Sequence, residues 1–338
     1  QAINFFCLYG AYVLGKHWVA TPLNGFWKYF LRPRKNLQAR YGEGTWALVT
    51  GAGDGIGEEL CYQLAQAGFH IVLLSRTQSK MEVVAKNIES KYGVKTKVVT
   101  YDFSALSAAS EGQKFEALMK KETGDLDISI LVNNVGMGWM GSFHTTPSLK
   151  MFNLLTVNCA SQVVVSRYFL AQCAKNRQGK KCALVDYSSM GALGNNPPPK
   201  LIQYGATKAF NLWLSKGIAA EYAHTLKQNP GSEHNVDLDV LTVHPASVKT
   251  QMNSGRYPGT VTAAAHAKGV IDKLGWDSCT YGHWVHAARD FIMDYEPFKT
   301  INKMQWAARR RAFLKEKAAQ EAEQAAAKKI EDDKAAEQ

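Results

Sequence analysis

The sequence predicts an α/β protein in which one parallel sheet is covered by helices on both faces. Several short stretches are continuously apolar, as strands buried on both faces are. Stretches with the periodicity of amphipathic helices separate them, and parallel strands need such crossovers. No internal repeat is visible in the sequence. We therefore expect a single doubly wound domain that spans residues 45–295.

Six apolar runs are the expected strands. In chain order they are 46–50, 69–75, 95–102, 128–134, 181–189 and 237–245. Helical patterns are clearest at 57–67, 150–177 and 204–224. The first run leads directly into a cluster of glycines, which indicates a tight connection into the helix that follows.

The composition is that of a chain with a sizeable buried core. Hydrophobic residues make up 46% and charged residues 20% of the 338 residues, which excludes a disordered chain, a collagen-like fibre and a disulfide-stapled miniprotein. The six cysteines are scattered and form no CxxC pair, so we expect neither a zinc site nor a thioredoxin-type motif. We predict no metal site and a reducing compartment.

The net charge of +11 is concentrated at the two ends of the chain. Residues 1–40 contain six basic residues and no acid, with nine aromatic residues among the first 30 positions. Rings and cations together suit the headgroup layer of a bilayer, so we predict a membrane-associated segment over 1–40. The alternative is an arm packed on its own domain or on a partner. We expect no cleaved signal peptide and no nucleic-acid partner, because no recognition module accompanies the charge.

Residues 300–338 are a third segment, first basic and then dominated by Ala, Glu, Gln and Lys. This composition favours a helix, but almost no apolar stripe continues after Phe313 and Leu314. Such a helix cannot bury itself. We therefore expect the protein to form a homo-oligomer or to be a subunit of a larger membrane assembly.

A glycine-rich loop follows the first expected strand and opens a helix. Glycines here allow a tight turn, the approach of a pyrophosphate to the backbone and close helix–strand packing, while the helix N-terminus faces the phosphates. The expected result is a Rossmann-type dinucleotide site formed by Gly51, Gly53, Asp54, Gly55, Ile56 and Gly57.

Arg76 follows the second expected strand, 19 residues after Gly57. An NAD site places a carboxylate here to bind the ribose hydroxyls, whereas a guanidinium matches a 2′-phosphate. We therefore predict NADP(H) as the cofactor rather than NAD(H). At the ends of the next two strands, Asp102 can accept from the adenine amino group and Asn133 can border the adenosine.

Tyr204 and Lys208 lie four residues apart at the start of a helix, which places the phenol and the ammonium on one face. A nearby ammonium favours the phenolate, so we expect the pKa of Tyr204 to fall toward neutrality. Such a tyrosine can protonate a carbonyl oxygen while a reduced cofactor delivers hydride. Ser189 can bind the same oxygen, and Asn158 can hold a water that links Lys208 to solvent.

Through these motifs the chain resembles the short-chain dehydrogenase/reductase family over about 45–295. TGAGDGIG, NNVG, the serine, YGATK and HPASVKT occur in the family's order. The resemblance implies a catalytic tetrad of Asn158, Ser189, Tyr204 and Lys208. It also implies that the cofactor is held by Gly51, Gly55, Gly57, Tyr204 and Lys208, with Pro245, Val248 and Thr250 at the nicotinamide carboxamide.

WALVTGAGDGIG, LLSR and LVNNVGMG are most similar to one branch of that family. The branch contains very-long-chain 3-oxoacyl-CoA reductase and the 17β-hydroxysteroid dehydrogenases of types 3 and 12. The resemblance implies an NADPH-dependent enzyme of the endoplasmic reticulum membrane. Its lipid-like substrate would be a 3-oxoacyl-CoA of fatty acid elongation or, alternatively, a 17-ketosteroid.

The chain departs from the family's pattern in three places. Ser189 precedes Tyr204 by 15 residues, more than is usual, because NNPPPK at 195–200 looks like a two-residue insertion. Ala246 stands where the family often has glycine, and the C-terminus lacks paired lysines, which makes the mitochondrial inner membrane an alternative location. These departures and the basic ends motivate a third hypothesis, a structural, cofactor-binding subunit of a larger membrane complex.

Overall fold

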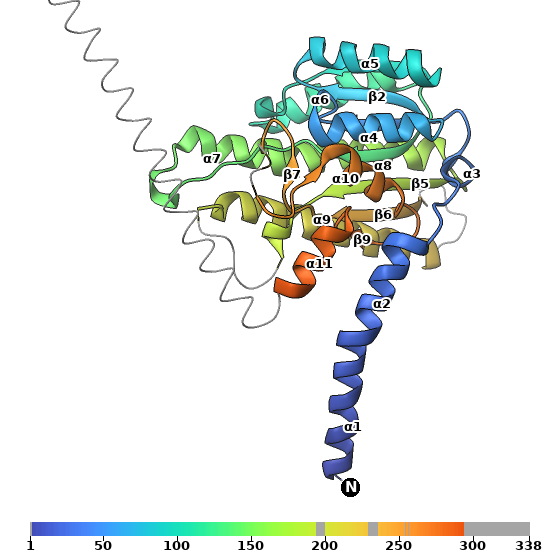
Figure 1. Cartoon of the computed structure of the whole chain (residues 1–338). Helices are drawn as coiled ribbons and strands as arrows, with labels where there is room; N and C mark the ends of the chain where they lie inside the picture. The colour runs from blue at the N-terminus through green and yellow to red at the C-terminus, as the bar shows by residue number, and fades with distance from the viewer. Residues whose placement is uncertain (1, 194–199, 229–235, 254, 256, 294–338) are drawn as a thin grey trace, which may run out of the picture. The chain divides into compact units, whose positions relative to one another are not determined.

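The computed structural model describes residues 2–193, 200–228, 236–253, 255 and 257–293. Its centre is a parallel sheet of seven strands in the order β3-β2-β1-β4-β5-β6-β9 (Figure 1). The strands are β1 (Trp46–Thr50), β2 (His70–Ser75), β3 (Thr96–Thr100), β4 (Ile128–Asn133), β5 (Lys181–Tyr187), β6 (Asp237–Val243) and β9 (Cys279–Thr280). The predicted doubly wound sheet is confirmed, and each of its six expected strands lies within two residues of the predicted ends.

Helices cover both faces of this sheet. Three of them pack on one face: α4 (Gly55–Gln66), α5 (Gln78–Tyr92) and α10 (Ala263–Ile271). Three others pack on the opposite face: α6 (Ala109–Thr123), α8 (Ser161–Asn176) and α9 (Ile202–Gln228). Successive residues of a strand point to opposite faces, so Ala47 and Val49 join the first core and Leu48 joins the second.

Several short elements have no counterpart in the predicted pattern. Strand β9 has two residues, too few to show an apolar run. A separate two-stranded parallel sheet pairs β7 (Val248–Lys249) with β8 (Val261–Thr262). Three 3₁₀ turns complete the loops: η3 (Phe103–Ala105), η4 (Phe143–Thr145) and η6 (Met190–Ala192).

The N-terminal residues form one helical run of alternating α and π turns. Its parts are α1 (Ala2–Gly15), η1 (Lys16–Ala20), α2 (Thr21–Phe26) and η2 (Trp27–Leu31), and α3 (Leu37–Tyr41) follows. The last turn of the run contacts the domain: the Lys28 ammonium lies 3.2 Å from the Asp277 carboxylate, and the Phe30 and Trp284 rings are 5.8 Å apart.

One helix among the described residues is long and apolar enough to cross a membrane, the run Ser148–Asn176. It consists of α7 (Ser148–Leu155), the π-helical turn η5 (Thr156–Ala160) and α8. Its apolar window is 56% buried inside the protein, as in a core helix of a soluble domain. Membrane association of residues 1–40 stays a prediction.

The chain divides into two compact units, Gln1–Ala287 and Ala288–Gln338. Helix α11 (Trp284–Met293) ends the described part of the chain. The predicted C-terminal segment 300–338 lies outside the described residues, and so do residues 194–199 of the loop before α9.

The strand order reverses between β1 and β4. From β1 the chain winds outward through β2 and β3, and from β4 it winds the other way through β5 and β6. Ligands of open α/β sheets bind in the crevice outside the carboxyl ends of the strands at this point. The glycine loop, the NNVG segment and Ser189 directly follow β1, β4 and β5, so the fold brings them to one edge of the sheet.

Candidate active site

The loop after β1 is shaped by glycines. Gly51 and Gly55 have φ angles of 67° and 60°, which residues with a side chain rarely adopt. A Cβ on Gly57 would lie 2.1 Å from the Gly51 carbonyl oxygen, so α4 begins in direct contact with the loop. The result is a backbone-lined cradle at a helix N-terminus, which fits the pyrophosphate of a dinucleotide.

Asn134 fixes the shape of this loop, although the sequence analysis singled out only its neighbour. Its side-chain amide donates to the Thr50 carbonyl oxygen at 3.1 Å, and its backbone N–H donates to the Thr50 hydroxyl at 3.0 Å. A Cβ on Gly51 would lie 3.0 Å from the same amide nitrogen. The residue that follows β4 therefore holds the start of the glycine loop in place through its hydrogen bonds to Thr50.

The two residues predicted at the adenosine have their side chains engaged elsewhere. The buried Asn133 amide donates to the Ser166 hydroxyl at 2.8 Å and to the Asp186 carboxylate at 2.9 Å. The exposed Asp102 carboxylate accepts from the backbone N–H of Ser104 at 2.9 Å. Neither side chain forms a hydrogen bond with the glycine loop in these contacts, so binding of a cofactor by Asn133 and Asp102 stays a prediction.

Lys80 lies beside Gly53 at the rim of the cradle, and Arg76 follows Ser75, which lies beside the same glycine. A Cβ on Gly53 would lie 3.8 Å from the Ser75 hydroxyl, and the exposed Arg76 is the next residue along the chain. The same Cβ position is 3.4 Å from the Lys80 Cβ. Arg76 is predicted from its place after the strand, whereas no sequence pattern indicates Lys80, which the first turn of α5 brings beside Gly53.

Lys80 also connects the loop to the segment after β7. Its ammonium lies 2.9 Å from the Asp54 carboxylate and donates to the Gln251 amide oxygen at 3.0 Å. Asp54 immediately precedes α4, whereas the partly buried Ile56 packs against the core. Because the ion pair is half exposed, it contributes little to stability by itself. Its effect is to hold a cation over the glycine loop.

Ser189 and Tyr204 are brought together in spite of their wide spacing. Ser189 follows β5, and it lies close enough to Tyr204 in the first turn of α9 to lower the pKa of the phenol. The Ser189 hydroxyl also accepts from the backbone N–H of Gly191 at 3.1 Å. The strand end and this turn fix the serine, so the longer loop that follows does not displace it.

Lys208 and Asn158 meet at the end of β4. A Cβ on Gly136 would lie 3.3 Å from both the Lys208 ammonium nitrogen and the Asn158 amide oxygen. Both side chains are buried, and the Lys208 ammonium donates to the Tyr187 carbonyl oxygen at 2.9 Å. The Asn158 amide donates to the Thr207 hydroxyl at 2.9 Å. All four members of the predicted tetrad therefore lie at this edge of the sheet.

Asn158 occupies the π-helical turn between α7 and α8. Its side chain accepts from the backbone N–H of Met137 at 2.8 Å and donates to the Met137 carbonyl oxygen at 3.0 Å. Single π turns within α-helices occur frequently at functional sites. The side chain is committed to Met137 and Thr207, and its predicted role in holding a water stays a prediction.

The prediction that the pKa of Tyr204 falls toward neutrality is wrong. Burial raises the pKa of Tyr204 above its ordinary value, and the interaction with Ser189 offsets only part of that rise. The Lys208 ammonium is directed to the Tyr187 carbonyl oxygen instead. Burial also lowers the pKa of Lys208, to about 8.

Asp186 is a buried acid next to this group that the sequence analysis overlooked. Burial raises the pKa of Asp186 to about 6, while hydrogen bonds, the first from Asn133, and the charge of Lys208 act in the opposite direction. The Asp186 carboxylate in turn favours the charged form of Lys208. No sequence pattern marked it, because an acid at a strand end resembles a loop residue.

The predicted nicotinamide segment spans the crevice. The Pro245 carbonyl oxygen accepts from the backbone N–H of Met190 at 3.1 Å, in the turn after Ser189. At the other end, the Thr250 Cγ2 atom lies 3.1 Å from the position of a Cβ on Gly55. Between them, Val248 is buried in β7. The segment therefore reaches from the serine to the glycine loop, as its predicted role requires.

His286 of α11 supports this segment and was also missed. It is fully buried, and its ring nitrogens lie 3.3 Å from the Ala246 backbone nitrogen and 3.1 Å from the Ser247 carbonyl oxygen. A single histidine forms no periodic pattern in a sequence, so only the structure shows that His286 contacts Ala246 and Ser247.

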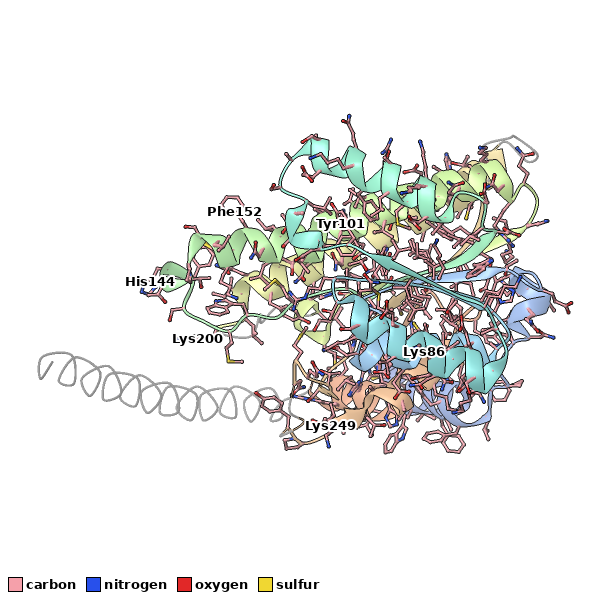
Figure 2. The ribbon with its side chains drawn as sticks, turned by 90° about the horizontal axis from the view of Figure 1, so that it is seen from above. Lys86, Tyr101, His144, Phe152, Lys200 and Lys249 are labelled. Carbon is pink, nitrogen blue, oxygen red and sulfur yellow. The ribbon has the colours of Figure 1, made fainter. Side chains whose placement is uncertain are left out.

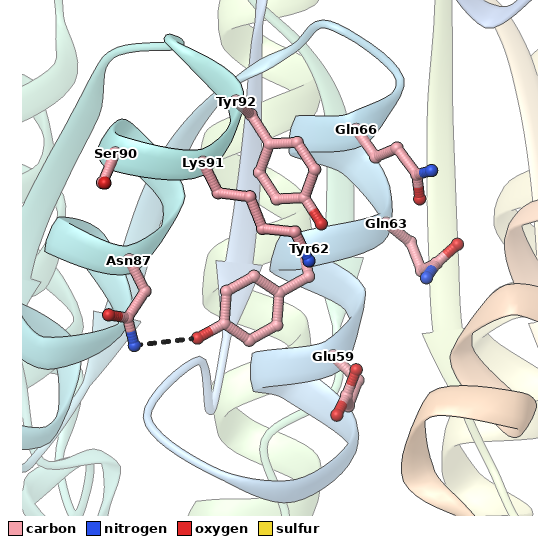
Figure 3. Close-up of a pocket in the computed structure, with 8 residues that line it drawn as sticks. All are labelled: Glu59, Tyr62, Gln63, Gln66, Asn87, Ser90, Lys91 and Tyr92. Atoms are coloured by element: carbon pink, nitrogen blue, oxygen red, sulfur yellow. Dashed lines mark hydrogen bonds between the residues drawn. The ribbon is translucent and has the colours of Figure 1, made fainter.

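An open polar groove lies between α4 and α5, as Figure 3 shows. The Asn87 amide donates to the Tyr62 hydroxyl across it at 3.3 Å. The lining residues are Glu59, Tyr62, Gln63, Gln66, Asn87, Ser90, Lys91 and Tyr92. None of them belongs to the predicted site, so this groove is separate from the crevice.

Known proteins resemble the chain in both sequence and structure. The model of the short chain dehydrogenase family matches residues 45–259. Very-long-chain 3-oxoacyl-CoA reductase-B of Danio rerio is 32% identical over 277 residues, which are 79% of this chain and 81% of that protein. Very-long-chain 3-oxoacyl-CoA reductase of Podospora anserina is 31% identical over 283 residues, 82% of this chain and 74% of the relative.

A solved structure described in terms of 7beta-hydroxysteroid dehydrogenase stereoselectivity has 26% identity and a TM-score of 0.60, and the match covers 73% of this chain and 89% of that one. The serine, tyrosine and lysine lie beside a cradle that fits a dinucleotide. Together with the similarities in sequence, this makes the protein an oxidoreductase that takes a nicotinamide cofactor and acts on a carbonyl or hydroxyl group. The chain belongs to the short-chain dehydrogenase family.

Proposed function

We propose that this protein uses NADPH to reduce a 3-oxoacyl-CoA to the corresponding 3-hydroxyacyl-CoA. The observation that carries the proposal is that Ser189 lies close enough to Tyr204 to lower the pKa of the phenol, at the same sheet edge as the glycine cradle. Two relatives at 31% and 32% identity are named very-long-chain 3-oxoacyl-CoA reductases, which supports a ketone on a long acyl chain as the reacting group.

In this mechanism the chain's own residues bind the carbonyl oxygen and protonate it. The Ser189 hydroxyl donates to the oxygen and orients it, and the Tyr204 Oη atom transfers its proton to it. The reduced nicotinamide, when bound, supplies the hydride. A hydrogen bond aimed at the developing oxyanion stabilises the transition state more than the ground state, because the negative charge appears only there.

The raised pKa of Tyr204 is suited to the direction of reduction. A phenol with a raised pKa is fully protonated at neutral pH, and the protonated form is the one that reduction consumes. Lys208, with a pKa of about 8, is mostly cationic at neutral pH. In this structure its ammonium donates to the Tyr187 carbonyl oxygen. In the proposed mechanism its positive charge favours the phenolate that remains after proton transfer.

Preference for NADPH over NADH rests on the rim of the cradle. Lys80 lies beside Gly53, where the adenosine ribose is expected, and Arg76 directly follows Ser75 at the same place. Both side chains carry a positive charge that can bind a 2′-phosphate, and neither can accept from a ribose hydroxyl. The carboxylate typical of NAD sites is not the residue that follows β2 in this chain.

Reduction of a 17-ketosteroid is the second candidate. The similarity to a structure described in terms of 7beta-hydroxysteroid dehydrogenase stereoselectivity supports it, because a fused-ring ketone presents the same reacting group. The mechanism at Tyr204 and Ser189 would be unchanged. Only the recognition of the rest of the substrate distinguishes the two candidates.

The proposal includes a membrane surface as the place of action. The helical run of residues 2–31 exposes aromatic rings, among them those of Tyr9, Tyr12, Trp18, Phe26 and Trp27. Amphipathic rings of this kind anchor proteins at the headgroup layer, where long acyl chains also partition. We favour the endoplasmic reticulum membrane, with the mitochondrial inner membrane as the alternative. Flotation of the full chain with phospholipid vesicles tests this, and a chain that stays at the bottom of the gradient contradicts it.

A direct assay tests the proposed activity. Purified full-length protein is incubated with NADPH and either a 3-oxoacyl-CoA or a 17-ketosteroid, and the products are identified by mass spectrometry. We expect the 3-hydroxyacyl-CoA to form with stoichiometric loss of NADPH. Steroid reduction alone would establish the second candidate, and reduction of neither substrate would contradict both.

A further inference from the structure

Lys200 is strained at the edge of the active site. It is the one residue other than glycine with a positive φ angle, 70°, among the residues that the structure describes. Residues with a side chain adopt this conformation rarely, and such strain concentrates at functional sites. Lys200 precedes α9 and lies four residues before Tyr204. Nothing in the catalytic mechanism above uses it.

The strained backbone attaches Lys200 to the loop that follows β4. Its carbonyl oxygen accepts from the backbone N–H of Gly141 at 2.9 Å, and its ammonium donates to the Ser142 hydroxyl at 2.6 Å. One hydroxyl uses only one of the three N–H groups of an ammonium. The side chain is partly exposed, so its charge remains accessible to a ligand (Figure 2).

This loop leads from the catalytic group to Lys200. At its inner end, Gly136 lies against Lys208 and Asn158. Further out, a Cβ on Gly138 would lie 3.5 Å from the Met252 sulfur, so the loop packs against the segment that follows β7. Gly141 is five residues beyond Gly136, a span of at most ~18 Å. Lys200 therefore lies within the reach of a long substrate whose carbonyl is at Tyr204.

The segments around the crevice carry almost no negative charge. No Asp or Glu occurs between Asp127 and Asp186, between Asp186 and Glu221, or between Asp239 and Asp272. Asp186 is fully buried, and the Asp54 carboxylate at the glycine loop is paired with Lys80. In contrast, His144 and Lys150 are exposed in or next to the loop that Lys200 holds, and the Lys150 ammonium lies 5.6 Å from the Trp139 ring centre. A surface with this charge attracts an anionic substrate.

We propose that Lys200 binds the phosphate groups of the coenzyme A part of the substrate. This inference rests on the proposed function, because it assigns the far end of the 3-oxoacyl-CoA. The pantetheine arm separates the thioester from the phosphates, and the loop from Gly136 to Gly141 likewise leads from the catalytic Lys208 to Lys200. A lysine ammonium is a common phosphate ligand and would have no partner on a neutral steroid.

The test compares two thioesters of the same 3-oxoacyl group, one of coenzyme A and one of uncharged N-acetylcysteamine. Lys200→Asn removes the charge but keeps a residue that tolerates positive φ angles, and Lys200→Arg keeps the charge. Lys86→Asn, at an exposed position of α5, is the matched control. We expect Lys200→Asn to raise KM about tenfold for the coenzyme A ester only. Lys200→Arg and Lys86→Asn should stay within about twofold of the wild type for both esters.

Two further readouts separate this proposal from the proposed function. Raising the salt concentration should increase the KM of the wild type for the coenzyme A ester and should change that of Lys200→Asn much less. Free coenzyme A should bind the wild type about tenfold more tightly than Lys200→Asn, whether or not either thioester is reduced. Equal losses with both thioesters, or equal affinities for free coenzyme A, would overturn the proposal.

Discussion

Replacing Gly57 by alanine tests the geometry of the glycine cradle. The new Cβ would lie 2.1 Å from the Gly51 carbonyl oxygen and 2.6 Å from the Asn134 amide nitrogen. Non-bonded contacts of a Cβ shorter than 3.0 Å are essentially never seen, so the Gly51 carbonyl must move by almost 1 Å. Overpacking of this kind costs about 1–3 kcal/mol, more than the ~1 kcal/mol that alanine contributes to a helix. Displacement of the loop should also weaken NADPH binding by roughly tenfold to a hundredfold.

Gly217→Ala is the matched control. Gly217 lies in α9, and a Cβ there would meet nothing within 4 Å, so the variant should be stabilised by about 0.5–1 kcal/mol with unchanged cofactor affinity. Urea denaturation gives the free energy of unfolding, and quenching of protein fluorescence by NADPH gives the dissociation constant. A Gly57→Ala protein with wild-type stability and wild-type NADPH affinity would refute the description of the cradle.

Three other predictions concern the cofactor and the ionisable groups. Arg76→Asp should shift the ratio of kcat/KM for NADPH over NADH toward NADH by at least about tenfold, and an unchanged ratio would remove Arg76 from the cofactor site. With the pKa of Lys208 at about 8, kcat/KM of the wild type should fall as the pH rises through that value, because Lys208 loses its charge. Lys208→Arg should move this fall beyond pH ~10, and a fall at the same pH would assign it to another group. Asp186→Asn removes a negative charge that favours charged Lys208, so the fall should begin roughly half to one pH unit lower. A profile identical to that of the wild type would show that Asp186 does not tune Lys208.

The strands and the order of the motifs are predictable from the sequence because they depend on local patterns. Runs such as 46–50 and 128–134 are apolar on both faces, and the glycines after the first run mark a turn that few other residues can form. The carboxyl ends of parallel strands share one edge, so residues that follow these runs meet in space.

The features of the site that sequence patterns do not predict depend on contacts between segments that are far apart in the chain. Lys80 reaches Asp54, and His286 reaches the loop after β6, only because α5 and α11 pack where they do. The raised pKa of Tyr204 has the same origin, since burial of the phenol outweighs the opposing effect of Ser189. The spacing of Tyr204 and Lys208 predicts a shared helix face, but it does not predict that Lys208 bonds to Tyr187.

The most direct test of the account compares Tyr204→Phe with the wild type in two measurements on the same preparations. One is the rate of NADPH oxidation with a 3-oxoacyl-CoA, and the other is the dissociation constant of NADPH by fluorescence. The account predicts that Tyr204→Phe lowers the rate at least roughly a hundredfold and leaves the dissociation constant within about twofold. A Tyr204→Phe protein that still reduces the substrate at a comparable rate, or that loses NADPH binding as fully as it loses activity, would contradict the role of Tyr204 as proton donor.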